Sequence, residues 1–254
     1  MKKNLVPIYV SGDRNLVEEF IGSAGNGGWQ IIGKINGSPA RKGMPRGMRH
    51  SAKVSRSVGV ALELSQDERT KRENLRAIDR QLRPDAVILS SSVLVTAAVQ
   101  AEWLRRPERL IGIGAFPTLL SRPLIELACT IRTSDTALQN CMSFLKDSGR
   151  EVSVVQDRVG MVMPRILCMI INEAAFALTE QVASPADIDT AMKLGTNYPE
   201  GPIAWGDRIG FSSVERLLLA LRDDLGEDRY RPAPLLRQLA SGNAWWNEKS
   251  PKKG

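Results

Sequence analysis

The sequence predicts an α/β protein in which a domain built on a mostly parallel sheet, residues 1–156, precedes an all-helical domain, residues 157–247. Two observations predict this arrangement. Short β-branched runs alternate with amphipathic stretches as far as Val155, which is typical of a parallel sheet covered by helices. Beyond Val155 the strand pattern stops and long apolar helical patterns replace it. We expect residues 248–254 to form a disordered tail.

The elements of the first domain follow in order. The predicted strands are short, rich in branched residues and bounded by turn residues; they are residues 6–10, 29–35, 58–64, 86–89, 110–113, 125–130 and 152–155. The predicted helices place apolar residues three and four positions apart; they are residues 15–23, 67–82 and 134–148. The serines at positions 90–92 are expected to open a further helix.

The second domain is predicted to hold helices at residues 165–182, 184–194, 212–224 and 234–241. The start of the second of these is well marked. Ser184 is a favoured N-cap residue, Pro185 fits the first helical position, and Asp187 is favoured by the helix dipole.

Composition excludes several classes of protein. The chain has 254 residues, 43% of them hydrophobic and 25% charged, as in soluble globular proteins. No apolar run approaches the roughly 18 residues of a membrane span, and the apolar run after Lys2 and Lys3 is too short for a signal peptide. We therefore expect a cytoplasmic protein without a membrane partner.

The three cysteines, Cys129, Cys141 and Cys168, are widely spaced and lie in apolar surroundings. An odd number without paired spacing argues against a disulfide framework and against a metal site. We expect all three to be buried packing residues, and we expect no metal.

A basic segment, residues 41–56, carries six Lys or Arg and no acidic residue, within a net charge of +7. Such a segment can contact the phosphates of a nucleotide, a CoA or a nucleic acid, or it can be a solvated loop. It lacks the interleaved aromatic residues of many nucleic-acid surfaces, so a nucleic-acid partner is not expected. His50, the sole histidine, lies in this segment, far from any nucleophile motif.

The helical half carries the most specific motifs. Residues 157–167 read Asp-Arg-Val-Gly-Met-Val-Met-Pro-Arg-Ile-Leu and are similar to the Asp-Arg-Pro-Gly-Phe-Val-x-Asn-Arg-Ile-Leu of 3-hydroxyacyl-CoA dehydrogenases. Residues 197–202, Asn-Tyr-Pro-Glu-Gly-Pro, resemble the Asn-Tyr-Pro-x-Gly-Pro of that family, and residues 230–236 resemble its closing motif. The resemblance implies a Rossmann-like first domain, NAD as cofactor, an acyl-CoA substrate, and dimerisation through the helical domain.

The resemblance breaks at the catalytic residues. Residues 110–126 look like the stretch in which the family has Ile-Gly-x-His-Phe-Phe-Asn-Pro followed by a glutamate. Gly114 stands at the histidine, Glu126 at the glutamate, and Pro164 at an asparagine that contacts substrate in the family. Ser91 is the best match to the serine that contacts the substrate hydroxyl. Glu126 and Ser91 are therefore the remaining catalytic candidates, whereas Gly114 and Pro164 mark lost positions.

The dinucleotide fingerprint is also missing, so the Rossmann-like domain is degenerate. A Gly-x-Gly-x-x-Gly turn lets the backbone approach a diphosphate above a helix N-terminus. After its first strand this chain keeps Gly12 but places Asp13 where the diphosphate needs hydrogen-bond donors. Glu63 and Arg72 match family positions near the cofactor and are the cofactor-binding candidates. The resemblance therefore implies NAD binding, whereas the missing glycines and Asp13 argue against it.

Three functional hypotheses remain open at this point. The first is a degenerate homologue that binds an acyl-CoA, or that pairs with itself or with an active paralogue. The second is an active NAD-dependent dehydrogenase with Glu126 as the base, and the third is another acyl-CoA-directed enzyme that uses Glu126 and Ser91. The purely structural alternatives pair Glu126 with Arg122, make Ser91 a helix N-cap, and leave Arg72 solvated.

Overall fold

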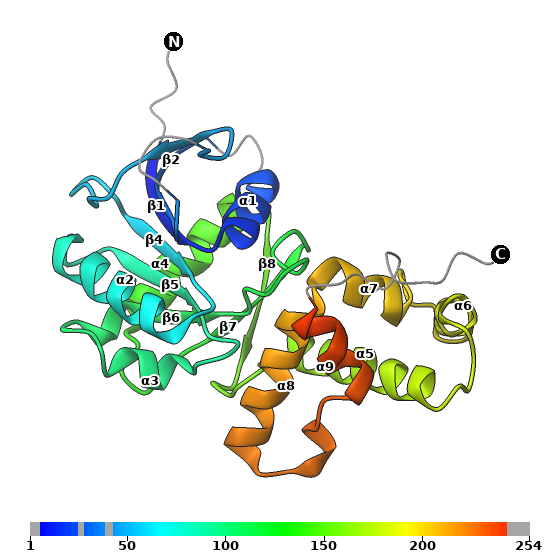
Figure 1. Cartoon of the computed structure of the whole chain (residues 1–254). Coiled ribbons are helices and arrows are strands. Elements are labelled where there is room, and N and C mark those ends of the chain that lie inside the picture. The colour runs from blue at the N-terminus through cyan, green and yellow to red at the C-terminus, as the bar shows by residue number, and fades with distance from the viewer. Residues whose placement is uncertain (1–5, 25–27, 39–42, 243–254) are drawn as a thin grey trace. The chain divides into compact units, whose positions relative to one another are not determined.

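The computed structural model describes residues 6–24, 28–38 and 43–242 (Figure 1). The predicted tail, residues 248–254, lies outside these residues. The chain forms two compact units, Met1–Met161 and Val162–Gly254, each of which is described by itself. The division falls a few residues after residue 156, where the sequence analysis placed the domain boundary.

The N-terminal unit contains, among its described residues, an eight-stranded sheet in the order β3-β2-β1-β4-β5-β6-β7-β8. All neighbouring strands are parallel except β6 and β7, which are antiparallel. The order of the first six strands is that of the Rossmann fold, which confirms the predicted fold class. The strands are β1 (Val6–Gly12), β2 (Trp29–Ile35), β3 (Met48–His50), β4 (Val60–Leu64), β5 (Val87–Ser91), β6 (Leu110–Ile113), β7 (Leu124–Ala128) and β8 (Glu151–Val155).

Helices cover both faces of this sheet. On one face, α1 (Arg14–Ser23) and α4 (Asp135–Asp147) contribute buried apolar residues to a core with the strands. On the other face, α2 (Glu68–Gln81) and α3 (Ala97–Ala101) do the same. Figure 1 shows α2 in cyan at the left, beside β5 and β6, and α3 in green at the lower left. The sheet thus lies between two layers of helices.

The prediction that the serines at 90–92 open a helix is wrong. Ser91 is the last residue of β5 and pairs with Ile113 of β6, and Ser92 N–H continues the ladder by donating to the Ile113 carbonyl at 3.0 Å. Helix α3 begins only at Ala97, after Thr96 as N-cap. The tendency of serine to open helices is overridden here because strand pairing satisfies the same backbone groups. The short edge strand β3, inside the basic segment, was not predicted either.

The helical unit is built around α5 (Met163–Thr179), which packs against α7 (Pro202–Ile209), α8 (Phe211–Leu225) and α9 (Pro234–Ser241). The predicted cap of α6 (Pro185–Thr196) is confirmed, because Ser184 Oγ accepts the Asp187 N–H at 3.2 Å. Helix α7 was not predicted. Its N-terminus is capped from a distance in sequence by Asp189, whose carboxylate oxygens accept from the Ile203 and Ala204 N–H groups at 2.8 and 3.0 Å.

Helix α6 differs from the other long helices of this unit because none of its residues is buried. Leu194 is 82% exposed, and Val182, just before the helix, is 69% exposed. A helix in water normally buries an apolar stripe against a neighbour. The outer side of α6 therefore presents apolar surface that no residue in the described part of the chain covers.

The three cysteines are free thiols, and two of them, Cys141 and Cys168, are fully buried as expected. Cys129 is only partly buried, so the expectation for this residue is wrong. Burial and, to a smaller extent, Cys129 raise the pKa of the Cys141 thiol to about 12, and burial also raises the pKa of the Cys168 thiol. Both thiols are therefore protonated at neutral pH. No helix within the described part of the chain is long and apolar enough to cross a membrane.

The raised pKa of Cys141 predicts a loss of stability at high pH. Below the unfolded-state value of 9.0 the contribution is fully present, and it is lost as the pH rises towards about 12, because the unfolded thiol ionises first. One such group adds a slope of up to about 1.4 kcal/mol per pH unit. We expect Cys141→Val to flatten the fall in the free energy of unfolding above pH 9, measured by urea denaturation. An unchanged slope would contradict this assignment.

Candidate functional site

Polar side chains gather where β1, β2, β4 and β5 end. In a Rossmann fold, ligands bind outside the carboxyl ends of the strands at the point where strand order reverses, here between β1 and β4. The residues at this edge that hydrogen-bond to one another are called the polar network below; they are Asp13, Asn36, Glu63, Ser65, Lys71 and Asn74.

Glu63 and Lys71 form a buried ion pair at the centre of the polar network. Lys71 Nζ lies 2.6 Å from Glu63 Oε2, and the two side chains are 2% and 0% exposed. Lys71 also reaches Ser90 Oγ at 3.4 Å. The other oxygen of Glu63 accepts from Ser65 N–H at 3.1 Å and from Asn74 Nδ2 at 3.2 Å. Glu63, a cofactor-binding candidate, is thus enclosed by Ser65, directly after β4, and by Lys71 and Asn74 of α2.

Asp13 extends the polar network to the N-terminus of α1. Its carboxylate accepts from Asn36 Nδ2 at 2.8 Å through one oxygen and from Gln66 N–H at 2.9 Å through the other. Asn36 also donates to Ser65 Oγ at 2.8 Å, and its carbonyl oxygen accepts from Asn74 Nδ2 at 3.2 Å. The loops that follow β1, β2 and β4 are therefore joined by side chains of the protein itself.

Gly12 is the one glycine kept from the expected fingerprint, and its surroundings explain why. Its φ is +150°, and a Cβ built on it would lie 2.6 Å from the backbone carbonyl carbon of Leu64. A side chain at this position would therefore clash with β4. The close contact between β1 and β4 therefore explains why this residue is glycine, and no ligand is needed for the explanation.

These residues do not fit the diphosphate of a dinucleotide. Such a group needs N–H donors and a close glycine backbone at the N-terminus of the first helix. The first βα turn instead presents the carboxylate of Asp13, which already occupies the Gln66 N–H. Asn36 stands directly after β2, where an acidic residue commonly binds the ribose, and it bonds inward.

Arg72, the second cofactor-binding candidate, lies on the outer side of α2. Its guanidinium pairs with Glu68 at 2.8 Å and stacks over the Trp103 ring at 4.6 Å. Stacking and pairing fix the side chain on the protein surface. The alternative of a solvated Arg72 therefore describes the residue only in part, because its guanidinium has two partners on the protein.

Glu126 and the position of the missing histidine lie side by side. Gly114 N–H donates to the Glu126 carbonyl at 2.9 Å, which joins the end of β6 to β7. A Cβ built on Gly114 would lie 3.2 Å from Glu126 Cβ, 3.4 Å from its Oε2 and 3.7 Å from Met161 Sδ. Glu126 itself is 8% exposed. Even the first carbon of a histidine side chain would thus be crowded at this position.

Ser91 lies next to the same segment. It is buried, and its hydroxyl donates to the Ala115 carbonyl at 2.8 Å. It is not a helix N-cap, which corrects the structural alternative considered from the sequence. The structure therefore brings Ser91, Gly114 and Glu126 together around residues 114 and 115. The serine hydroxyl already has a backbone partner there.

Pro164 belongs to the helical unit and lies in the first turn of α5. Proline is well tolerated there because the N–H that it lacks would have no partner within the helix. It is buried and brings no carboxamide. The position that matches the family's asparagine is therefore filled by a residue that serves only helix initiation.

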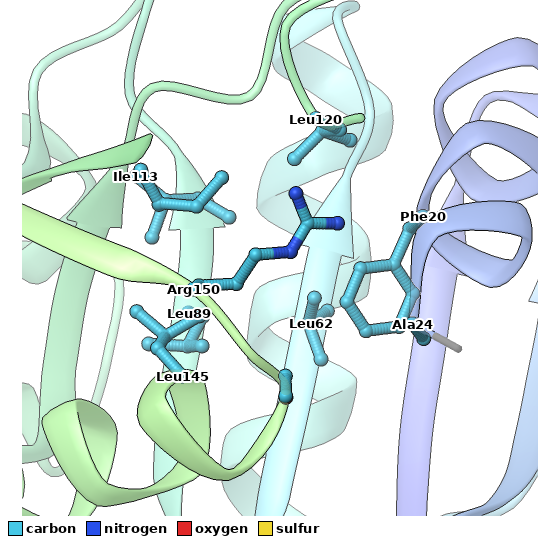
Figure 2. A pocket seen from close by; sticks show the side chains of 10 residues that line it. Phe20, Ala24, Leu62, Leu89, Ile113, Leu120, Leu145 and Arg150 are labelled. Carbon is cyan, nitrogen blue, oxygen red and sulfur yellow. The ribbon is translucent and has the colours of Figure 1, made fainter. Parts of the chain in front are cut away.

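A small apolar cavity lies on the other face of the sheet, between α1, α4 and the strands (Figure 2). Its volume of about 20 Å³ has room for a single water molecule and none for an acyl chain. Figure 2 shows the Arg150 guanidinium among apolar side chains. Burial lowers the pKa of Arg150, an effect that the charge of Glu19 opposes. Arg150 Nη1 donates to the Arg122 carbonyl, so the arginine ties β8 to the loop before β7.

His50 is the last residue of the edge strand β3, which runs parallel to β2, and it pairs with Gly33. The basic residues Arg49, Lys53 and Arg56 of the same segment are exposed. Within the described ranges no group of three His, Cys, Asp or Glu side chains is placed to hold a metal ion.

The sequence analysis missed most of the polar network. A signal was present: Lys71 and Asn74 share the face of α2 that carries Leu75 and Ile78, and Glu63 lies in an apolar strand. Polar residues at buried positions need partners. Their pairing with Asp13 and Asn36, however, depends on contacts between residues far apart in sequence.

Comparison with known proteins gives the family. The family model "3-hydroxyacyl-CoA dehydrogenase, NAD binding domain" matches residues 49–158, and "3-hydroxyacyl-CoA dehydrogenase, C-terminal domain" matches residues 160–252. The chain is similar to the 3-hydroxyadipyl-CoA dehydrogenase of Escherichia coli, with 37% identity over 74% of this chain and 38% of that protein. It is also similar to a probable 3-hydroxybutyryl-CoA dehydrogenase of Bacillus subtilis, with 32% identity over 74% of this chain and 65% of that protein.

The matches thus span less than two thirds of each of these relatives. Among solved structures, M. tuberculosis FadB2 shares the fold, with a TM-score of 0.82, 20% identity and 94% of both chains covered. The two family matches follow one another along the chain and together include Glu63, Ser91, Gly114, Glu126 and Pro164. The chain belongs to the 3-hydroxyacyl-CoA dehydrogenase family.

Proposed function

We propose that this chain is a degenerate member of its family, without NAD-dependent dehydrogenase activity, that acts as an acyl-CoA binder or as a non-catalytic subunit. The observation that carries the proposal is the geometry at Gly114. The family's imidazole takes the proton of the substrate hydroxyl, and a positioned general base of this kind contributes about 10² to 10⁴ in rate. Here the base is absent, and Glu126 crowds its place.

The misfit of the first βα turn to a diphosphate supports the same proposal. Hydride transfer needs the nicotinamide cofactor in place, so losing its binding site removes the hydride acceptor. The relatives' names state dehydrogenase activity on 3-hydroxyacyl-CoA substrates. An acyl-CoA is therefore the ligand class that we propose for this chain.

The uncovered outer side of α6 supports a subunit role. Symmetric dimers are the commonest soluble oligomers, and an exposed apolar surface often marks an interface. We propose that the helical domain pairs with a second copy of this chain or with an active paralogue. The exposed Leu194 and Val182 would then lie in that interface.

An activity assay tests the loss of catalysis. We expect purified protein to oxidise NADH with acetoacetyl-CoA at a rate at least about 10⁴-fold below that of an active homologue. We also expect Gly114→His to remain inactive, because the first βα turn still presents the Asp13 carboxylate and the new Cβ would lie 3.2 Å from Glu126 Cβ. Turnover by the wild type that disappears in Glu126→Gln would contradict the proposal and support the alternative in which Glu126 is the base. Calorimetry with acetoacetyl-CoA tests acyl-CoA binding separately.

The oligomeric state tests the subunit role. We expect the chain, alone or mixed with an active paralogue, to form a dimer in sedimentation velocity. Leu194→Asp should raise the dissociation constant at least about tenfold, because it buries an unpaired charge in the interface. Glu200→Gln, on the same unit but in an ion pair with Arg208, is the matched control and should leave the dimer intact. A dimer that is insensitive to Leu194→Asp would exclude α6 from the interface.

A further inference from the structure

We propose that Asp13 acts as an internal anion that takes the place of a dinucleotide diphosphate and closes the carboxyl edge of the sheet. This inference rests on the proposed loss of dehydrogenase function, and it names the residue that excludes the cofactor. It rests on the contacts of the Asp13 carboxylate and on how the neighbouring positions are satisfied.

The first step concerns position. Asp13 directly follows β1 and precedes the first residue of α1, Arg14. The N-terminus of this helix is where a Rossmann fold binds diphosphate, because free N–H groups and the helix dipole attract negative charge there. The Asp13 carboxylate supplies negative charge at this place. A second anion would be repelled by it.

The second step concerns the donors. Asp13 does not cap its own helix through its side chain. Its two carboxylate oxygens turn instead to Asn36 Nδ2, from the loop after β2, and to Gln66 N–H, from the loop after β4. These loops flank the strand-order reversal, so the carboxylate bridges the two sides of the crevice in which a dinucleotide would lie.

The third step concerns the rest of the crevice. The side-chain nitrogen of Asn36 donates to Asp13 and Ser65, and its side-chain oxygen accepts from Asn74. Behind it, Ser65 and Asn74 bond to the Glu63–Lys71 pair. A ligand that enters would have to break hydrogen bonds in which charged groups take part, and these are stronger than neutral ones. The edge is therefore closed by bonds within the chain.

The experiment compares ADP-ribose and NADH binding to wild type, Asp13→Asn and Asp13→Gly by calorimetry. Asp13→Asn keeps the shape of the side chain and an acceptor for the Gln66 N–H, whereas Asp13→Gly removes the group. The control is Asp67→Asn, an N-cap aspartate of α2 that accepts from Thr70 N–H at 2.8 Å. Circular dichroism and amide exchange at Gln66 establish that each variant is folded and whether the Asp13 bond is lost.

We expect no saturable binding by wild type or Asp67→Asn up to the highest ligand concentration used. A folded Asp13 variant should bind ADP-ribose with a dissociation constant at least about tenfold below that concentration, because the like charge is gone. Saturable NADH binding by wild type would overturn the inference. Folded Asp13 variants that gain no affinity would overturn it as well. Neither result contradicts the proposed loss of dehydrogenase activity unless NADH is also turned over. A failure of this inference can therefore be told apart from a failure of the proposed function.

Discussion

The ion pair between Glu63 and Lys71 is the contact on which the carboxyl edge of the sheet depends. Removing two charges from water is costly, and a buried pair persists only when its geometry is good and its remaining atoms find hydrogen bonds. Here Ser65, Asn74 and Ser90 provide those bonds. Because these partners come from the loop after β4, from α2 and from β5, satisfying one buried pair fixes the relative positions of three segments. Asn36 and Asp13 are then held by the same side chains.

The fold was largely predictable from the sequence because its signals are local. The seven predicted strands are all present in the sheet, and the caps of α2 and α6 lie at aspartate and serine residues that favour helix starts. The predictions that were wrong also have physical causes. Ser90 to Ser92 read locally as a helix start, yet pairing with β6 keeps Ser91 in the strand. Helix α7 depends on Asp189, which lies a dozen or so residues before its N-terminus and gives no local signal.

The candidate site was predictable only in part. Motif positions identified Gly114 and Glu126, because the family pattern fixes their order along the chain, and the structure places them in contact. Motif positions also suggested Glu63 and Arg72 as cofactor residues. Glu63 lies at the carboxyl edge but is held in a buried ion pair, and Arg72 pairs with Glu68 and stacks on Trp103, so a cofactor role for either stays a prediction. Side-chain partners are set by tertiary contacts, which a single sequence does not contain.

The crowding between Gly114 and Glu126 has a consequence for how this lineage can change. A Cβ at residue 114 would lie 3.2 Å from Glu126 Cβ, so a side chain at this position requires its neighbours to shift by a few tenths of an ångström. Putting an imidazole there therefore changes the packing of Glu126 as well. Residues 114 and 126 are coupled, and a substitution at one alters the surroundings of the other.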